Sequence, residues 1–213
     1  MITAIVLSAG QARRMGAQKV LLPYGETTVI EHITAAIKAG GADEIIAVTG
    51  HEGDRVARAL SGSGVRIAYN EDYHGGMLGS VRCGIRAASA GSEAFLIAVG
   101  DQPSIRADVV RLLLDTFASM QEGPGTIVVP TYSGKRGHPV IFSSCFRQEV
   151  LTRFDDVGLR GLLHAHPDAV REVPMETSGI LRDMNVPEDY KKELDELAKL
   201  RSDVTERGIH ESS

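Results

Sequence analysis

The residues best suited to chemistry lie near the start of the chain, where a turn of small residues precedes basic side chains. The turn consists of Ser8, Ala9 and Gly10, and backbone N–H groups in such a turn can approach a ligand closely. Three cations follow: Arg13, Arg14 and Lys19. The first carboxylate is Glu26, although the 213-residue chain carries a net charge of −5 at pH 7. The segment predicts a polyphosphate site, with a basic, solvent-exposed loop as the alternative.

This segment matches neither of the two common phosphate-binding motifs. A P-loop needs adjacent Gly and Lys, whereas two residues separate Gly16 from Lys19. The dinucleotide fingerprint needs a glycine two positions after the first one, and that position is Ala12. The prediction therefore depends on the coincidence of a turn, cations and the end of an apolar run.

A single carboxylate follows another apolar run, residues 94–99. Asp101 comes directly after Gly100, and Pro103 stiffens the turn. Ligands in open α/β sheets bind at the carboxyl ends of strands, and Mg²⁺ takes one or two protein oxygens together with phosphates and waters. Asp101 is therefore predicted to bind Mg²⁺; the alternative is that it caps a helix beginning near Ser104.

Other candidate groups give weaker signals. His164 and His166 are two residues apart, and side chains at that spacing do not share a helical face, so we expect no metal site there. Cys83 and Cys145 are too few for a disulfide framework. This use of cysteine fits a reducing compartment and predicts a cytoplasmic protein.

The composition excludes several classes of protein. Hydrophobic residues make up 43% and charged residues 24%, which is ordinary for a globular protein. The longest apolar run, residues 94–99, is far shorter than the ~20 residues needed to span a bilayer. The chain has no Trp and a negative net charge, so we expect neither a nucleic-acid nor a membrane partner.

Short apolar runs alternate with amphipathic stretches, and this alternation predicts a Rossmann-like, mainly parallel α/β sheet with helices on both faces. Strands are expected at residues 2–8, 44–49, 65–69, 94–99, 126–129, 132–143 (after a turn) and 170–173. Helices are expected at residues 28–39, 53–60, 79–88, 107–120, 146–154, 159–166 and from Pro187 onward. Residues 1–200 are predicted to form one domain, and residues 201–213 a disordered tail.

Residues 7–25 resemble the signature L-A-A-G-x-S-x-R-M-G-x-x-K-x-L-L-P of small nucleotidyltransferases that act on molybdenum cofactor, the molybdopterin nucleotidyltransferase family. Ten positions match: Leu7, Ala9, Gly10, Arg14, Met15, Gly16, Lys19, Leu21, Leu22 and Pro23. Ser8 replaces the usual Ala, and Ala12 replaces the usual Ser. The second departure removes a hydroxyl that the family signature places near the phosphates.

Five further segments match the family in order, so the resemblance spans residues 5–190. They are residues 70–85 (with Asn70, Gly76, Met77 and Ser80), 100–103 (G-D-x-P), 136–142, 156–160 (D-x-G-x-R) and 183–190. In the last segment Val186 stands where Thr is usual. Within the family the chain is most similar to the cytidylyltransferases.

The resemblance implies the nucleotide-diphospho-sugar transferase type of fold, with one antiparallel strand from residues 137–142. It implies transfer of CMP from CTP to the terminal phosphate of molybdopterin cofactor, with Mg²⁺ as the cofactor and pyrophosphate as the second product. A molybdoenzyme or its chaperone would receive the product. No general base is needed, because the acceptor phosphate is largely dianionic at pH 7, its second pKa being ~6.

The resemblance also assigns roles to individual residues. The catalytic residues are Arg14, Lys19 and Asp101. The nucleotide-binding residues are Leu7, Ser8, Ala9, Gly10, Lys19, Asn70, Gly76, Ser80 and Asp101. The metal ligands are Asp101 and Asn185, with Asp183 as the alternative if the register differs. The pterin-side residues are His138, Pro139 and Arg160, and for His138 an ordinary loop position is the alternative.

The choice of base is inferred from Ala9. Guanylyltransferases of this family tend to carry L-A-G-G at the first turn and cytidylyltransferases L-A-A-G, and a methyl group there favours a pyrimidine over a purine. Three alternatives stay open: a guanylyltransferase, a reductase that uses NAD(P)H on a pigment-like substrate, and a non-catalytic cofactor-binding protein. The lack of a G-x-G-x-x-G motif argues against the reductase.

Overall fold

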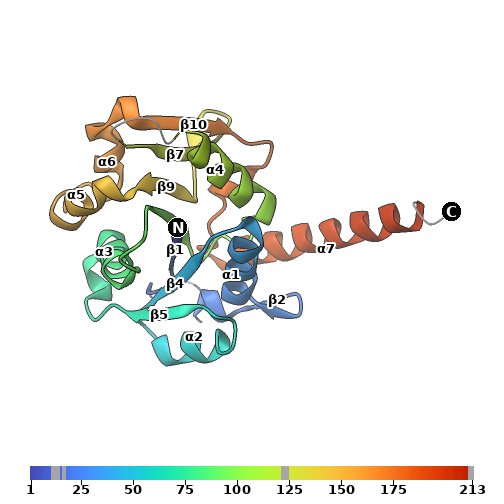
Figure 1. Ribbon diagram of the computed structural model, residues 1–213. Helices are drawn as coiled ribbons and strands as arrows, with labels where there is room; N and C mark the ends of the chain where they lie inside the picture. Colours follow the sequence, from blue (N-terminus) through green and yellow to red (C-terminus); the bar gives the residue numbers. More distant parts are fainter. Residues whose placement is uncertain (11–14, 16–17, 121–124, 211–213) are drawn as a thin grey trace.

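A mixed sheet of eight strands runs through the part of the chain that the computed structural model describes (Figure 1). The structure describes residues 1–10, 15, 18–120 and 125–210, and side chains as far as residue 200. The strand order is β10-β7-β9-β6-β1-β4-β5, with β8 paired to β7. The strands are β1 (Ile2–Leu7), β4 (Glu44–Thr49), β5 (Arg66–Tyr69), β6 (Ala94–Val99), β7 (Ile127–Tyr132), β8 (Lys135–Arg136), β9 (Val140–Ser143) and β10 (Val170–Pro174). A separate hairpin joins β2 (Pro23–Tyr24) and β3 (Thr27–Thr28).

The pairing is mostly parallel, as the sequence predicted. β1 pairs in parallel with β4 and β6, β5 with β4, and β10 with β7. β9 is antiparallel to both β6 and β7, which confirms the expected antiparallel strand in the 137–142 region. β8 is a second antiparallel strand that the sequence did not predict. It forms because Gly134, at φ 74°, turns the chain directly back onto the end of β7.

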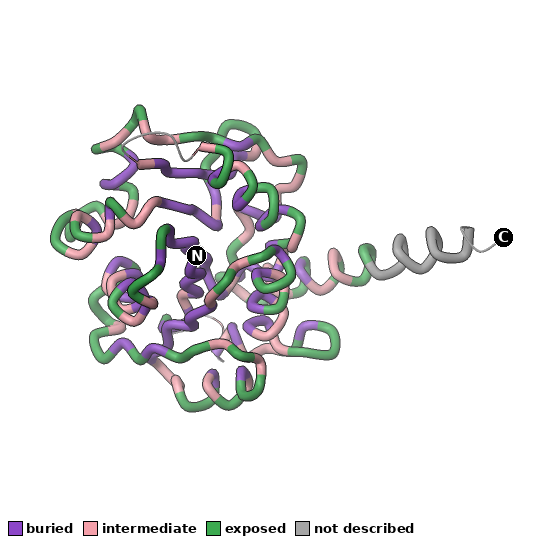
Figure 2. The backbone as a smooth tube through the Cα atoms, viewed as in Figure 1, coloured by how far each residue is buried: buried purple, intermediate pink, exposed green. Residues whose placement is uncertain are grey.

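Helices cover both faces of the sheet, and its buried strands are apolar on both sides. In β1, Ala4 and Val6 belong to one buried cluster and Ile5 to the other, as expected for a covered parallel sheet. The first face carries α1 (Val29–Gly40), α2 (Gly53–Ala59) and α4 (Ala107–Ser119). The second carries α3 (Met77–Ala87), α5 (Arg147–Thr152) and α6 (Arg160–Ala165). The central strands are accordingly the most continuously buried part of the chain (Figure 2).

Short 3₁₀ helices connect several of these elements. They are η1 (Lys19–Leu21), η2 (Tyr73–Gly75), η3 (Ser144–Phe146), η4 (Pro167–Ala169) and η5 (Ser178–Leu181). The carboxyl ends of β1, β4 and β6 lie at the same edge of the sheet because the three strands are parallel. The turn at residues 8–10, the η2 segment and the Asp101 loop therefore meet at that edge.

The last helix, α7 (Pro187–His210), begins beside the sheet and projects away from the rest of the chain (Figure 1). Its backbone continues through most of residues 201–213, where the sequence led us to expect a disordered tail. Residues 188–210 contain no proline, the residue type that most strongly interrupts a helix. Among the described residues, no helix combines the length and the apolar character needed to cross a membrane.

Candidate active site

A cavity of about 400 Å³ opens at the carboxyl ends of β1 and β6. Eight of the nine predicted nucleotide-binding residues line it: Leu7, Ser8, Ala9, Gly10, Lys19, Gly76, Ser80 and Asp101. The ninth, Asn70, is buried, and its amide nitrogen donates a hydrogen bond to the Ser80 hydroxyl at 3.1 Å. Asn70 thus orients a lining residue. Arg13 and Arg14, the other two cations of this segment, lie outside the described residues.

The start of the turn at residues 8–10 is held against the neighbouring strands by hydrogen bonds. The Ser8 backbone N–H and hydroxyl both donate to the Val48 carbonyl, at 2.9 and 2.8 Å. The Gly100 N–H donates to the Leu7 carbonyl at 2.8 Å. A Cβ on Gly100 would lie only 2.8 Å from that carbonyl oxygen, so glycine is needed for β1 and the Asp101 loop to approach so closely.

Lys19 and Asp101, which both line this cavity, form an ion pair. The Lys19 Nζ donates to Asp101 Oδ2 and to the Met184 carbonyl, the latter at 3.2 Å. Both side chains are 18% exposed, so the pair is only partly screened by water. The sequence predicted both residues for the site, and the structure adds that the lysine ammonium neutralises the carboxylate.

A divalent cation would find few protein ligands here. Asp183 and Asn185 line the same cavity as Asp101, but no group of three or more His, Cys, Asp or Glu side chains in the described part of the chain could hold a metal ion. A small set of hard oxygen donors suits Mg²⁺, which keeps several waters and binds substrate phosphates. The Lys19 ammonium already occupies a position at Asp101 that favours a cation. The residues present therefore fit Mg²⁺.

The sequence analysis missed one residue that joins the two sides of this cation position. Gln102 is 2% exposed, and its amide nitrogen donates to Asp183 Oδ1 at 2.6 Å. The Met184 N–H donates to the Asp101 carbonyl at 3.0 Å. Gln102 occupies the x position of the G-D-x-P turn. Because any residue is allowed at that position, the motif assigned Gln102 no role.

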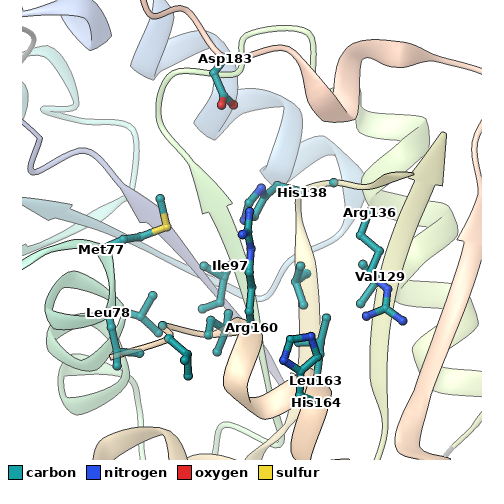
Figure 3. A pocket seen from close by; sticks show the side chains of 16 residues that line it. Met77, Leu78, Ile97, Val129, Arg136, His138, Arg160, Leu163, His164 and Asp183 are labelled. Carbon is teal, nitrogen blue, oxygen red and sulfur yellow. The ribbon is translucent and has the colours of Figure 1, made fainter. Parts of the chain in front are cut away.

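A second cavity, of about 560 Å³, adjoins the first and shares Met77, His138 and Asp183 with it. Figure 3 shows the side chains that line this second cavity. Its lining is mostly apolar, formed by Met77, Leu78, Val81, Ile97, Val129, Val140, Val157, Leu159 and Leu163. Polar side chains also line it: Arg136, His138, Arg160, His164 and Asp183. Two of the three predicted pterin-side residues, His138 and Arg160, thus lie together. Pro139 follows His138 through a cis peptide bond and is not part of this lining.

His138 stands where the two cavities join. Burial lowers its pKa from the ordinary value for histidine; the charges of Asp183 and Asp101 oppose this shift, and that of Arg160 adds to it. At pH 7 the ring is therefore neutral and can donate one hydrogen bond and accept another. The Arg160 side chain reaches toward it in Figure 3. This arrangement can bind an anionic group with one cationic and one neutral partner.

Two further lining residues had no role in the sequence analysis. Tyr73 lines the first cavity, and its ring contacts that of His74, with 4.2 Å between centroids. Met77 lies at the start of α3 and is 58% exposed, which is high for so apolar a side chain. Both residues lie in residues 70–85, a segment that resembles the family, and Met77 is one of the matching positions. The resemblance therefore indicated that this segment belongs to the site but gave neither residue a function.

Comparisons with known proteins identify the family. The family model described as "MobA-like NTP transferase domain" matches residues 4–170. The nicotine blue oxidoreductase of Paenarthrobacter nicotinovorans is 30% identical, covering 78% of this chain and 83% of that protein. The molybdenum cofactor cytidylyltransferase of Escherichia coli K12 is 27% identical, covering 89% and 93%.

A solved structure has the same fold. The crystal structure of Rv0371c from Mycobacterium tuberculosis H37Rv superposes with a TM-score of 0.80 at 28% identity, covering 91% of this chain and 97% of that one. Its manganese complex gives a TM-score of 0.76 at 27% identity, covering 91% and 98%. These matches agree with the nucleotide-diphospho-sugar transferase type of fold expected from the sequence.

Proposed function

The chain belongs to the family of MobA-like NTP transferase domains, and from this premise we propose that it transfers CMP from CTP to the terminal phosphate of molybdopterin cofactor. The observation that carries the proposal is the junction of two cavities at Met77, His138 and Asp183. A triphosphate in the smaller cavity and an acceptor in the larger one would meet there, as transfer between two bound substrates requires. Similarity to the Escherichia coli cytidylyltransferase supports this donor and acceptor.

The proposed reaction needs no protein base. An oxygen of the acceptor phosphate, largely dianionic at pH 7, attacks the α-phosphorus of CTP. A bond forms between that oxygen and the α-phosphorus. The bond from the α-phosphorus to the oxygen bridging to the β-phosphorus breaks, and its electron pair leaves with pyrophosphate. The protein's contribution is therefore alignment and neutralisation of charge.

Each part of the site has a place in this scheme. Lys19 and the backbone of the 8–10 turn would bind the triphosphate, together with Arg14. Asp101 and Asn185 would hold Mg²⁺, which when bound offsets negative charge on the phosphates; the manganese complex of Rv0371c supports a divalent cation. Neutral His138 and cationic Arg160 would orient the acceptor phosphate at the junction.

A second candidate function is reduction of an aromatic pigment with a nicotinamide cofactor. Two observations favour it: the 30% identity to nicotine blue oxidoreductase and the apolar lining of the larger cavity. A flat acceptor with few polar groups suits such a lining. The position of Asp101 beside Lys19 favours the transferase, because a cation held by this carboxylate would offset charge at a reacting phosphate, whereas hydride transfer involves no phosphate at the reacting atoms.

A competition assay tests the proposal. The protein is incubated with molybdopterin cofactor, Mg²⁺ and equal concentrations of CTP and GTP carrying distinguishable labels, and the dinucleotide products are separated. We expect mostly cytosine dinucleotide, with GTP used ~10–200-fold less, because one methyl group in a pocket is worth about 1–3 kcal/mol. Ala9, 4% exposed in the lining, supplies that methyl group, so Ala9→Gly should raise the share of GTP.

The outcomes separate the candidates. A product that is mostly guanine dinucleotide contradicts cytidylyl transfer and leaves a transferase. Failure to transfer from any nucleoside triphosphate, together with NADPH oxidation in the presence of a pigment acceptor, supports the second candidate instead.

A further inference from the structure

One buried carboxylate on α7 joins two segments of the candidate site on the side away from the cavity. Glu193 is 2% exposed. Its Oε2 accepts a hydrogen bond from the Ser104 hydroxyl, and its Oε1 lies 3.0 Å from the Arg182 Nε. The Arg182 guanidinium also donates to the Ser104 hydroxyl. Glu193, Ser104 and Arg182 therefore form a closed cluster, which we term the α7 anchor.

Each partner of Glu193 is close in sequence to a predicted metal ligand. Ser104 lies three residues after Asp101, and Arg182 three residues before Asn185. On the cavity side, the same two segments are joined by the Met184 N–H to Asp101 carbonyl bond and the Gln102–Asp183 bond. The segments are thus fixed to each other on both sides.

The start of α7 also contacts the segment that follows Lys19. The Tyr190 hydroxyl donates to the Pro23 carbonyl at 2.5 Å, and the Tyr24 hydroxyl to the Glu193 carbonyl at 3.4 Å. The Asn185 N–H donates to Asp189 at 3.0 Å. The first turns of α7 therefore touch the two segments that carry the predicted metal ligands and also the segment that follows Lys19. These turns lie outside residues 4–170, the part that matches the family model.

We propose that Glu193 is a positioning residue, which holds Asp101 and Asn185 at the separation that one divalent cation requires. Anchoring alone does not explain a charge here, because burying a carboxylate is costly and a well-packed apolar side chain is often as stabilising. Leu194 and Leu197 already pack α7 against the core. The inference rests on the proposed function only in assuming a divalent cation at Asp101.

The test measures binding of Mn²⁺ to the full chain by calorimetry, so its readout is independent of turnover. Glu193→Gln keeps the side-chain volume and removes the charge. We expect its Mn²⁺ dissociation constant to rise about tenfold, as for other residues that orient metal ligands. Ser104→Ala should act in the same direction, and it tests the proposal if Glu193→Gln does not fold.

Two control variants separate positioning from stability. Glu44 is a second carboxylate with serine and arginine partners, Ser89 and Arg66, and it lies at the amino end of β4. Glu44→Gln should lower the unfolding temperature and leave Mn²⁺ binding unchanged. Leu194→Ala loosens the packing of α7 without removing a charge, and it should also leave Mn²⁺ binding unchanged.

Asp101→Asn distinguishes failure of this inference from failure of the proposed function. Loss of Mn²⁺ binding in Asp101→Asn, with wild-type binding in both Glu193→Gln and Ser104→Ala, overturns the inference and leaves the cation site. Equal weakening of Mn²⁺ binding in Leu194→Ala and Glu193→Gln would mean that Glu193 only holds α7 in place, and this result also overturns the inference. Equal Mn²⁺ behaviour of wild type and Asp101→Asn overturns the proposed cation site and the inference with it.

Discussion

Replacing Lys19 by methionine should tighten Mn²⁺ binding in the absence of nucleotide while impairing transfer. In the structure the Lys19 ammonium sits on the Asp101 carboxylate. A metal ion that binds Asp101 must therefore displace the ammonium first. Methionine has a similar apolar stem and no charge, so Lys19→Met removes the competitor and leaves the carboxylate in place. The same change removes a cation proposed to bind the triphosphate, so CMP transfer should fall.

The size of the effect follows from the contact that is broken. A hydrogen bond to a charged group contributes roughly 1.5–3 kcal/mol, and at 18% exposure of each side chain solvent screens it only in part. Each 1.4 kcal/mol corresponds to about a factor of ten in affinity. The Mn²⁺ dissociation constant of Lys19→Met should therefore fall by roughly 10- to 150-fold, measured by calorimetric titration of the nucleotide-free protein.

Lys19→Arg is the matched control because it keeps the positive charge, and its Mn²⁺ affinity should stay near that of the wild type. The reasoning is refuted if Lys19→Met binds Mn²⁺ as weakly as the wild type or more weakly. That result would mean that the ammonium does not compete for Asp101.

Three other substitutions give distinct outcomes. Asp101→Asn should stay folded by circular dichroism and lose CMP transfer by ~10³-fold or more, because several kcal/mol of charge stabilisation disappear. Gly137→Ala puts a Cβ 2.3 Å from the Ile180 carbonyl oxygen, so urea unfolding should show a loss of roughly 1–3 kcal/mol. Burial alone would raise the pKa of Glu44. Its hydrogen bonds together have the larger effect in the opposite direction and lower this pKa to about 2. Its stabilising effect is present above the unfolded-state pKa of about 4.3 and is lost as the pH falls through the folded value, so the unfolding temperatures of wild type and Glu44→Gln should differ at pH 7 and converge near pH 2.

The residues at the ends of β1 and β6 were predictable from sequence because the signal there is local. An apolar run followed by a small-residue turn identifies a strand end, and parallel strands bring such ends to one edge of a sheet. The sequence alone therefore predicts that the 8–10 turn and Asp101 lie at the same edge of the sheet. The antiparallel β9 was expected only from the resemblance, since an apolar run does not indicate its direction.

The contacts of α7 were not predictable, for two physical reasons. Glu193 lies 89 residues from its partner Ser104, and no periodicity relates positions so far apart. A glutamate in an amphipathic helix is also normally solvent-exposed, so its sequence context predicts a surface side chain. Asn185 was placed at the site through the resemblance alone, because residues 183–185 follow a 3₁₀ helix and carry no repeating pattern.

The two cavities overlap at only three of the described residues, Met77, His138 and Asp183. This limited overlap affects how the specificity of each cavity can change during evolution. Substitutions at positions that share no contacts usually have additive effects. Changes at Leu163 or Val157 alter the larger cavity alone, so selection can vary the acceptor while the turn after β1 is conserved. A library randomised only in the larger cavity should therefore yield variants with altered acceptors and an unaltered nucleotide preference. Substitutions at the three shared residues should instead change the acceptor specificity and the nucleotide specificity together.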